Sequence, residues 1–350
     1  MLDNDIIEEK TISDSCCDIF KTVFQIDISN TAFRYKHYEN PYRLSTPLFV
    51  EKIGNKIKGI NGFMAAKFIC ESQELYAAQS CDSAVLEQYR GKGVFTAIIK
   101  NAQKQLQSAG VDFLFGFPNQ NSYPGFINLG WKHEVDLCRY FLPIDWYALL
   151  QNKIGKKCAR IAHTLLIQVT LSKINRLAKK TFNGTIKSYD LCPFNGEDYS
   201  IINNCGKIMI KRSLEYYVWK LDKNPTKNFK YIVAKEEGRL YGFVVYYVRD
   251  GEVDIVDWFC APTDNKYLIM AKLIKQLINE GTKINILSIN TKSEEVQFMK
   301  RLGFWNSSSR VLRRTTTPLV IYIMNATLES KLHVPEKWLL HCIDSDTIIS

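Results

Sequence analysis

Residues 85–95 read VLEQYRGKGVF, and the prediction of the fold starts from them. A β-rich run ends here, a glycine-rich turn follows, and a helix with regularly spaced apolar residues begins at Val94. Glycines let backbone amides approach an anion closely, and a helix N-terminus adds unpaired N–H groups and a positive dipole. Arg90 and Lys92 add formal charge. The stretch predicts a phosphate or pyrophosphate cradle, although such turns also occur for purely structural reasons.

The flanking sequence predicts an αβ unit around this turn. Before it come a hairpin, PLFVEKIG and KIKGINGFMAA, and a further strand, ELYAAQSCDSAVL. After it come a helix over Val94–Ala109, a short strand VDFLFGFP, a short helix that ends at LGW (129–131), and a last strand DLCRYFLP. The alternation of strand and helix predicts a mixed α/β sheet fold.

The same unit occurs twice in the chain. YKHYENP (35–41) reappears as WKLDKNP (219–225), VEKIGNKIKG (50–59) as VAKEEGRLYG (233–242), and LGW as LGF (302–304). Copy two then predicts strands EVDIVDWFC and INILSIN, a helix over Tyr267–Ile278 and a last strand LRRTTTPLVIYIM (312–324). At the place of the glycine turn it has CAPTDNKY (260–267), in which Asp264 would repel phosphate. We therefore expect one anion cradle and one active site per chain, near the junction of the copies.

The segment between the copies is basic and amphipathic. Apolar residues at helical spacing alternate with eight Lys and Arg residues over 144–180, which predicts a helix or helix pair. An interdomain connector with a solvated face is the simpler interpretation. The more specific interpretation is a weak peripheral contact with an anionic membrane.

Length and composition narrow the class of protein. At about 100–200 residues per domain, a chain of 350 residues predicts two domains. The net charge of +10 suits a polyanionic partner, but no RNA-recognition signature, zinc finger or basic tail favours nucleic acid. Ten scattered cysteines, no apolar run long enough for a membrane span and no secretory signal predict reduced thiols in a cytoplasm. The sequence has no CxxC motif and no grouping of His and Cys residues, so it does not indicate a metal site.

The order of these motifs resembles the GCN5-related N-acetyltransferase (GNAT) superfamily. Its signature [QR]-x-x-G-x-[GA] fits Gln88-x-x-Gly91-x-Gly93, and Arg90-x-x-Gly93-x-Phe95 fits except at the final small residue. The family's closing motif is similar to Asn119–Trp131. The resemblance covers about residues 20–143 and implies two tandem GNAT-like domains, at 1–143 and 183–350, joined by a basic helical connector at 144–182. Copy two resembles the same fold without the cofactor turn, and its expected role is to complete the cleft.

The resemblance also implies a cofactor and a reaction. Acyl-coenzyme A would be held by Val85, Arg90, Gly91, Lys92, Gly93, Val94 and Asn121, and its thioester would be attacked by an amine. The tyrosine that serves as the general acid in this family corresponds to Phe126 here. Tyr123, one helical turn earlier, is therefore the candidate acid. The alternative is that the thiolate leaves without an acid. Candidates for the base are His37, Asp82 and, from copy two, Asp254 or Asp257. A carboxylate in an apolar strand needs a partner or a function.

Tandem chains of this layout resemble bacterial enzymes that N-acylate nucleotide-linked amino sugars, such as dTDP-3-amino-3,6-dideoxyhexoses, for O-antigen or capsule synthesis. This resemblance implies acetyl- or 3-hydroxybutyryl-CoA as the donor. The candidate substrate contacts are Tyr35, Tyr38, Asn40, Trp219, Asp257 and Trp258, with core packing as the alternative for the four aromatic residues. A monomer is expected, because the second copy can supply what a dimer partner would otherwise provide. The alternatives are a GNAT acting on a peptide, polyamine or antibiotic amine, an aminoacyl-tRNA-dependent enzyme, and a non-catalytic acyl-CoA-binding module.

Overall fold

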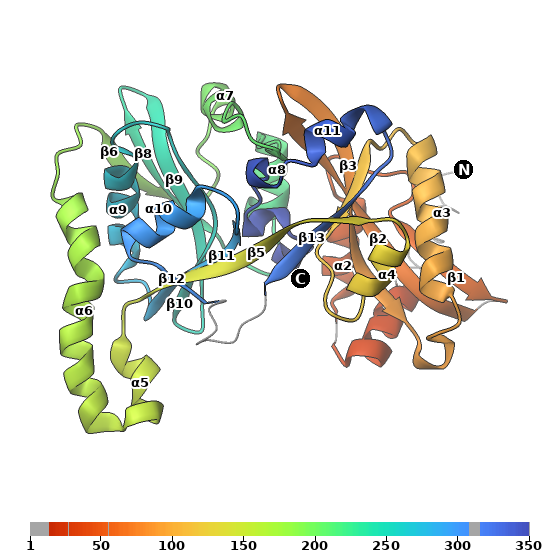
Figure 1. Cartoon of the computed structure of the whole chain (residues 1–350), viewed down its shortest axis with the longest axis horizontal. Coiled ribbons are helices and arrows are strands. Elements are labelled where there is room, and N and C mark those ends of the chain that lie inside the picture. The colour runs from red at the N-terminus through yellow and green to blue at the C-terminus, as the bar shows by residue number, and fades with distance from the viewer. Residues whose placement is uncertain (1–13, 27, 55, 308–315, 350) are drawn as a thin grey trace.

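One mixed sheet runs through the whole molecule. The computed structural model describes residues 14–349 except 27, 55 and 308–315. Its sheet has 13 strands within these residues, in the order β1-β2-β3-β4-β13-β5-β11-β10-β9-β8-β6, with β7 on β2 and β12 on β5 (Figure 1). The expected mixed α/β fold class is confirmed.

The first half, residues 14–143, has the predicted unit at the predicted places. Residues 14–24 are helical. The further elements are α2 (Asn30–Tyr38), β1 (Leu48–Ile53), β2 (Lys56–Cys70), β3 (Gln73–Val85), the 3₁₀ turn η1 (Glu87–Tyr89), α3 (Val94–Ser108), β4 (Phe113–Gly116), α4 (Tyr123–Asn128) and β5 (Lys132–Pro143).

A helical hairpin follows, and then the second half from residue 183 onward. The hairpin consists of α5 (Trp146–Ile154) and α6 (Lys156–Ala178) and lies at the left edge of the molecule (Figure 1). The second half contains β6 (Thr185–Tyr189), α7 (Gly196–Asn203), β7 (Met209–Ile210), α8 (Leu214–Tyr217), the π-helical turn η2 (Val218–Asp222), β8 (Lys230–Glu236), β9 (Arg239–Arg249), β10 (Glu252–Cys260), α9 (Lys266–Leu277), β11 (Lys283–Asn290), α10 (Glu295–Leu302), β12 (Trp305–Asn306) and β13 (Thr317–Ile323). Of the predicted last strand, residues 312–315 lie outside the described residues.

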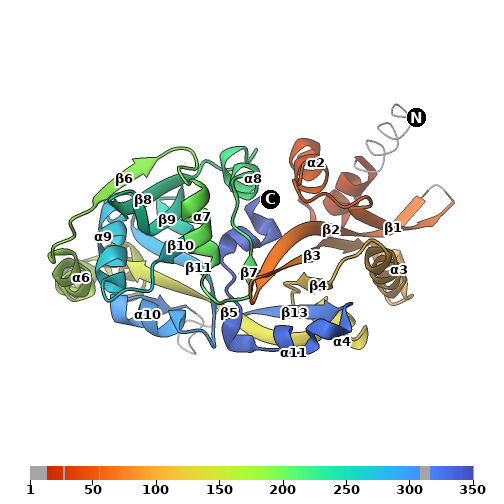
Figure 2. The same ribbon diagram turned by 90° about the horizontal axis from the view of Figure 1, so that it is seen from above.

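The two halves exchange their last strands. β13 of the second half lies between β4 and β5, whereas β5 of the first half pairs with β11 of the second. The sheet therefore crosses the predicted domain boundary at residue 143, because β5 and β13 each pair with strands of the other half. Figure 2 shows β5 and β13 joining the two sides of the molecule.

The repeated aromatic blocks meet at the junction of the halves. The Tyr35 hydroxyl donates to the carbonyl of Trp219 at 2.8 Å, and Trp219 Nε1 lies 3.5 Å from the carbonyl of Tyr35. Equivalent residues of the two blocks thus contact each other reciprocally, as they do across a two-fold axis. Both side chains are buried, so these two predicted substrate contacts pack the junction.

The chain ends in a series of short turns that return to the centre of the molecule. They are η3 (Ala326–Leu328), α11 (Glu329–Leu332), η4 (Pro335–Lys337), η5 (Cys342–Asp344) and η6 (Asp346–Ile348) (Figure 1). Among the described helices, none is both long and apolar enough to cross a membrane. All ten cysteines are free thiols in the structure.

Candidate active site

Strands β3 and β4 separate and open a cavity between them. Their parallel pairing ends at Ser80 and Gly116, but β3 continues to Val85. The β3 edge beyond Ser80 therefore faces a cavity of about 750 Å³, lined on one side by residues 80–85 and on the other by residues 117–126. Phe20, Val23 and Phe24 of the N-terminal helix close one wall. We call this space the donor cavity.

A bulge in β3 turns Asp82 into the donor cavity. Two residues of β3 stand opposite the single residue Asn61 of β2, and Asp82 takes a φ of 50°. Asp tolerates this left-handed conformation better than most residues do. The buried Asn61 amide holds the bulge, because it donates to Ser80 Oγ at 3.0 Å and accepts from Ser83 Oγ.

Two cationic or donor side chains from α2 bind Asp82. Lys36 Nζ lies 2.9 Å from its carboxylate, and His37 Nε2 lies 2.7 Å from Oδ2. Burial alone would raise the pKa of Asp82, but the Lys36 ammonium and the His37 N–H outweigh it and hold the pKa well below its usual range. Burial also lowers the pKa of His37. His37 is therefore a neutral donor that orients Asp82, and its fully buried side chain does not reach the cavity.

A second carboxylate reaches the same ammonium from the far end of the chain. Asp346 Oδ2 lies 3.1 Å from Lys36 Nζ, and its Oδ1 accepts from Gln79 Nε2 at 2.9 Å. Burial lowers the pKa of Lys36, but the carboxylates of Asp82 and Asp346 raise it by more, so the net change is an increase. Lys36 thus stays charged and joins one carboxylate from each half of the molecule.

The glycine turn has the geometry of an anion cradle. Gly91 and Gly93 have φ values of 71° and 77°, where other residues are strained. Gly93 is the N-cap of α3, and no side chain caps the helix. The first turn has no acidic residue, so its first N–H groups are free for an anion. Arg90 lines the donor cavity, and Lys92 is exposed beside it.

The other predicted cofactor residues are placed as follows. Val85 and Asn121 line the donor cavity, whereas the Val94 side chain is buried in the core beneath the turn. Phe95, which departs from the family signature, packs edge-on against Phe126 at 5.2 Å. A Cβ on Gly125 would approach the Phe95 ring to 2.9 Å, so glycine at 125 makes room for this aromatic wall.

Tyr123, the candidate acid, lies beside the donor cavity. Its hydroxyl is 3.1 Å from His133 Nδ1, and it lines a neighbouring cavity of about 840 Å³. Phe126, by contrast, lines the donor cavity itself. The role of Tyr123 as the acid stays a prediction.

A third cavity adjoins the donor cavity at Asp346. It has a volume of about 430 Å³, and its lining includes the cationic side chains of Arg139, Lys227, Arg249 and His341. Asp346 and Phe117 line both this cavity and the donor cavity. We call it the acceptor cavity. Lys227 Nζ donates to the carbonyls of Thr347 and Ile348 and thereby fixes the chain end against the cavity.

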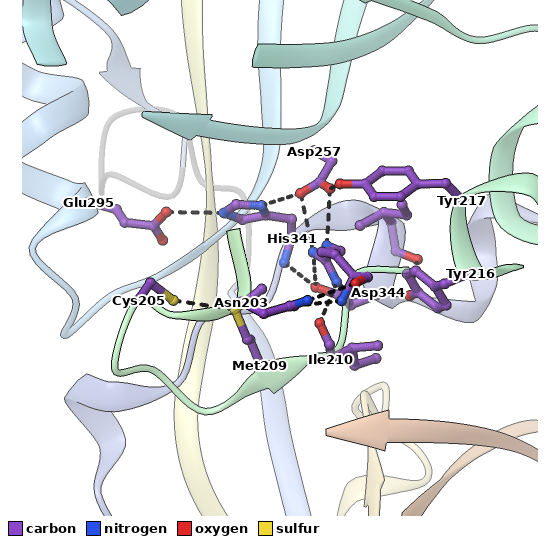
Figure 3. Close-up of polar contacts among 12 residues, drawn as sticks. Asn203, Cys205, Met209, Ile210, Tyr216, Tyr217, Asp257, Glu295, His341 and Asp344 are labelled. Carbon is purple, nitrogen blue, oxygen red and sulfur yellow. Dashed lines mark hydrogen bonds and ion pairs between the residues drawn. The ribbon is translucent and has the colours of Figure 1, made fainter. Parts of the chain in front are cut away.

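A buried polar cluster anchors the segment that carries Asp346. Arg212 binds Asp257 through Nε and Nη2 and Asp344 through Nη1 and Nη2, over distances of 2.5–3.2 Å. His341 bridges Asp257 at 2.6 Å and Glu295 at 3.1 Å (Figure 3). Burial opposes the charge on His341, but Glu295 and Asp257 raise its pKa to about 10. The cluster fixes Asp344, two residues before Asp346.

The remaining predicted substrate contacts lie outside both cavities. Asn40 holds a turn through Ala65 and Tyr42. Asp257 belongs to the buried cluster, and Trp258 stacks between Phe298 and His341. Tyr38 lies under Arg34 and lines a separate cavity of about 290 Å³. Asp254, the remaining candidate base, is buried and binds Asn285 and Arg249. Their contact with a substrate stays a prediction.

Lys36, Gln79 and Asp346 beside the donor cavity were missed in the sequence, as were Arg139, Lys227 and Arg249 of the acceptor cavity. Lys36 could have been found, because it recurs as Lys220 in the repeated block. Lys220 is also buried, and burial lowers its pKa to about 8. Asp346 gave no such signal, because it lies in turns without hydrophobic periodicity.

His37, Cys81 and Asp82 are the one group in the described residues whose ligand atoms lie close enough for a metal ion, within 4.8 Å of one another. Two features make a cation unfavourable there. The Lys36 ammonium already binds Asp82, and burial raises the pKa of the Cys81 thiol well above its usual value. The absence of a metal stays a prediction.

Comparison with known proteins gives a match for the part of the chain that carries the glycine turn and Asp82. Residues 8–133 match the family model of the acetyltransferase (GNAT) domain. No curated protein matches the chain. The fold is similar to that of a probable N-acyltransferase from Enterococcus faecalis V583, with a TM-score of 0.66 and 16% identity over 92% of this chain and 73% of that one.

Two GCN5-related N-acetyltransferases have the same fold. The protein from Anabaena variabilis ATCC 29413 gives a TM-score of 0.62 and 12% identity over 89% of this chain and 70% of that one. The protein from Kribbella flavida gives a TM-score of 0.60 and 10% identity over 91% of this chain and 70% of that one. At this identity the likeness establishes the fold, and the family match supports a CoA-dependent N-acyltransferase.

Proposed function

We propose that the protein transfers an acyl group from acyl-CoA to the primary amine of an acceptor that carries phosphate, with a nucleotide-linked amino sugar as the best-fitting class. The observation that carries this proposal is the position of Asp346. It lines both the donor cavity and the cation-lined acceptor cavity. An amine held there has a thioester site on one side and an anion site on the other.

On the donor side, acyl-CoA is the substrate that the glycine turn suits. Its pyrophosphate would bind the free N–H groups of α3 beside Arg90 and Lys92. Its acyl thioester would extend along the β3 edge between residues 80 and 85. The unpaired backbone of that edge supplies N–H groups that can stabilise an oxyanion.

On the acceptor side, the two exposed guanidinium groups of Arg139 and Arg249 provide planar donors for phosphate. Two carboxylates, Asp82 and Asp346, provide the complementary charge for the ammonium. A substrate with an amine at one end and phosphate at the other satisfies both sets. A polyamine or a purely cationic antibiotic would leave the guanidinium groups facing a positive charge.

The carboxylates act on the amine by binding and orienting it. Because the pKa of Asp82 is held low, the side chain is a poor proton acceptor, but it stays ionised and attracts an ammonium. The ammonium first loses one proton to solvent, and the neutral amine attacks the thioester carbon. As the C–S bond breaks, the nitrogen loses a second proton to solvent and the amide forms. Holding the amine nitrogen in contact with the thioester carbon supplies most of the rate enhancement. The thiolate leaves without an acid at position 126, since a thiol pKa near 8.5 makes it a good leaving group.

The test is an assay of thiol release that crosses acetyl-CoA and 3-hydroxybutyryl-CoA with dTDP- and UDP-amino sugars, polyamines and peptide amines. We expect turnover with a nucleotide-linked amino sugar and at least about 10-fold lower kcat/KM without the nucleotide, as the loss of one charged hydrogen bond implies. Turnover on a polyamine alone would contradict the acceptor assignment. Binding of acyl-CoA with no turnover on any amine would favour a non-catalytic binding module.

Substitution of Gly93 tests the donor site. We expect Gly93→Asp to weaken acyl-CoA binding by about 10-fold more than Gly93→Asn, measured by calorimetry. Asn and Asp tolerate a positive φ about equally and have the same shape, so the difference isolates the charge beside pyrophosphate. Equal affinities of the two variants would show that the pyrophosphate does not bind at this turn.

Arg139 tests the acceptor site. We expect Arg139→Gln to raise the KM for a dTDP-amino sugar by about 10-fold, because one charged hydrogen bond is lost. The KM for acyl-CoA should stay unchanged. Arg239→Gln is the matched control, because Arg239 is also exposed but does not line the acceptor cavity. Equal effects of the two substitutions would contradict phosphate binding there.

A tandem duplication accounts for the remaining features. The reciprocal contact of Tyr35 and Trp219 and the exchanged strands β5 and β13 support two GNAT-like units within one chain. Each unit supplies one carboxylate to the site, so a single chain suffices for activity, and we propose a monomer.

A further inference from the structure

The α5–α6 hairpin has an unbalanced charge. Residues 146–180 contain eight Lys and Arg residues and no Asp or Glu, although the chain as a whole has 36 acidic residues. The cations gather toward the two ends of α6, with Lys156, Lys157 and Arg160 at its start and Lys173, Arg176 and Lys179 at its end. Asp145, at the start of the hairpin, pairs with His163 of α6 and offsets only part of this charge. The remaining positive excess attracts anions.

Between these cations lies an exposed apolar ridge. Ile161, Leu165 and Val169 are 66%, 65% and 69% exposed and follow one another at a spacing of four residues, on one face of α6. They are the three most exposed large apolar side chains in the described part of the chain. The opposite face of α6, with Ala159, Thr170, Ile174 and Ala178, is buried against the second half.

We propose that α6 binds the surface of an anionic lipid bilayer, with the ridge of Ile161, Leu165 and Val169 in the interface and the flanking Lys and Arg residues on the lipid phosphates. A helix of 23 residues is about 35 Å long, which lets the central ridge enter the interface while both cationic ends reach headgroups. The hairpin lies at the edge of the molecule (Figure 1).

Charge complementarity selects the lipid surface over a second copy of the chain. Two ridges packed together would bring eight cations of one chain against eight of the other. Nucleic acid would satisfy the cations but would leave the apolar ridge in water. The proposal is independent of the amine that the enzyme acylates.

The test uses the full chain and sedimentation with phosphatidylcholine vesicles, with and without about 30% phosphatidylglycerol. We expect binding only to the anionic vesicles, a loss of at least 10-fold in the partition coefficient at high salt, and a further loss of about 5-fold in Leu165→Gln. Leu191→Gln is the matched control, because Leu191 is 64% exposed but lies outside the hairpin. Thiol release by each variant reports that it is folded.

Other outcomes would overturn the proposal. Equal binding of Leu165→Gln and the wild type would mean that only charge acts, as for a nucleic acid surface. Self-association that Leu165→Gln abolishes, without binding to vesicles, would assign the ridge to a second copy. No binding to anionic vesicles at low salt would leave α6 as a connector.

Discussion

Asp82→Asn is expected to lower kcat/KM for the amine by about 100-fold, which is the value of one strong hydrogen bond to a charged group. The substitution keeps the shape of the side chain and an acceptor oxygen for Lys36 and His37. It removes the negative charge that holds the ammonium at the point where β3 leaves β4. Affinity for acyl-CoA, measured by calorimetry, should change little, because the cradle lies on the opposite side of η1.

A carboxylate in the neighbouring cavity gives the control. Asp136→Asn removes a charge from a more exposed carboxylate, 42% exposed against 12% for Asp82, and should change kcat/KM by less than about 3-fold, as surface substitutions do. The pH dependence gives a second readout. Because the pKa of Asp82 is held well below its usual range, its carboxylate stays ionised from pH 5 to 9. The ratio of wild-type to variant kcat/KM should therefore be constant over that range, and a ratio that grows with pH would mean that Asp82 titrates there.

The local elements at this site could be predicted from the sequence. Apolar residues at helical spacing predict Val94–Ala109, and α3 spans Val94–Ser108. The glycine turn and the strand that carries Asp82 lie where the pattern places them. These features depend on neighbours in the chain, and short-range periodicity and turn chemistry are enough to identify them.

Long-range pairing could not be predicted in the same way. The alternating pattern of β5 identifies a strand but does not reveal that it pairs with β11 of the other half. For the same reason the contact between Asp346 and Lys36 could not be predicted, because 310 positions of the chain separate the two residues. Nothing in the local sequence of Asp346 distinguishes it from a solvent-exposed turn residue.

Asp257 illustrates a different limit. A carboxylate in an apolar strand needs a partner or a function, and the sequence predicts Asp257 as a candidate base and a substrate contact. In the structure Arg212, His341 and Tyr217 supply the partners instead. The inference that Asp257 must be bound to something was sound, but the identity of its partners depends on segments 40 to 84 residues away.

Arg212→Met should be the most destabilising single substitution that we predict. It leaves the carboxylates of Asp257 and Asp344 buried without their main counterion, and breaking a buried pair in this way costs about 3–5 kcal/mol. For a chain of this length that corresponds to a fall of about 4–7 °C in Tm, measured by calorimetry. Because Asp344 anchors the segment that carries Asp346, kcat/KM should also fall at temperatures where the variant is still folded.

The companion substitution separates charge from packing. Arg212→Met combined with Asp344→Asn removes one of the two orphaned charges and should recover part of the lost stability. It should not recover kcat/KM, since the anchor of the Asp346 segment is still absent. A double variant no more stable than Arg212→Met would mean that lost packing, rather than the unpaired carboxylate, causes the effect.

The same cluster should give a pH dependence whose sign follows from its pKa values. His341 has its pKa raised to about 10, so its contribution is complete below about pH 6.5 and is lost as the pH rises toward 10. Burial opposes ionisation of Asp257, but Arg212 and His341 lower its pKa to about 2, so its contribution is lost only as the pH falls below about 3.8. We therefore expect His341→Gln to be less stable than the wild type at pH 6, with a difference that shrinks toward pH 10. A difference that stayed constant over that range would mean that His341 is neutral between Asp257 and Glu295, and the ion pairs that anchor the Asp346 segment would then come from Arg212 alone.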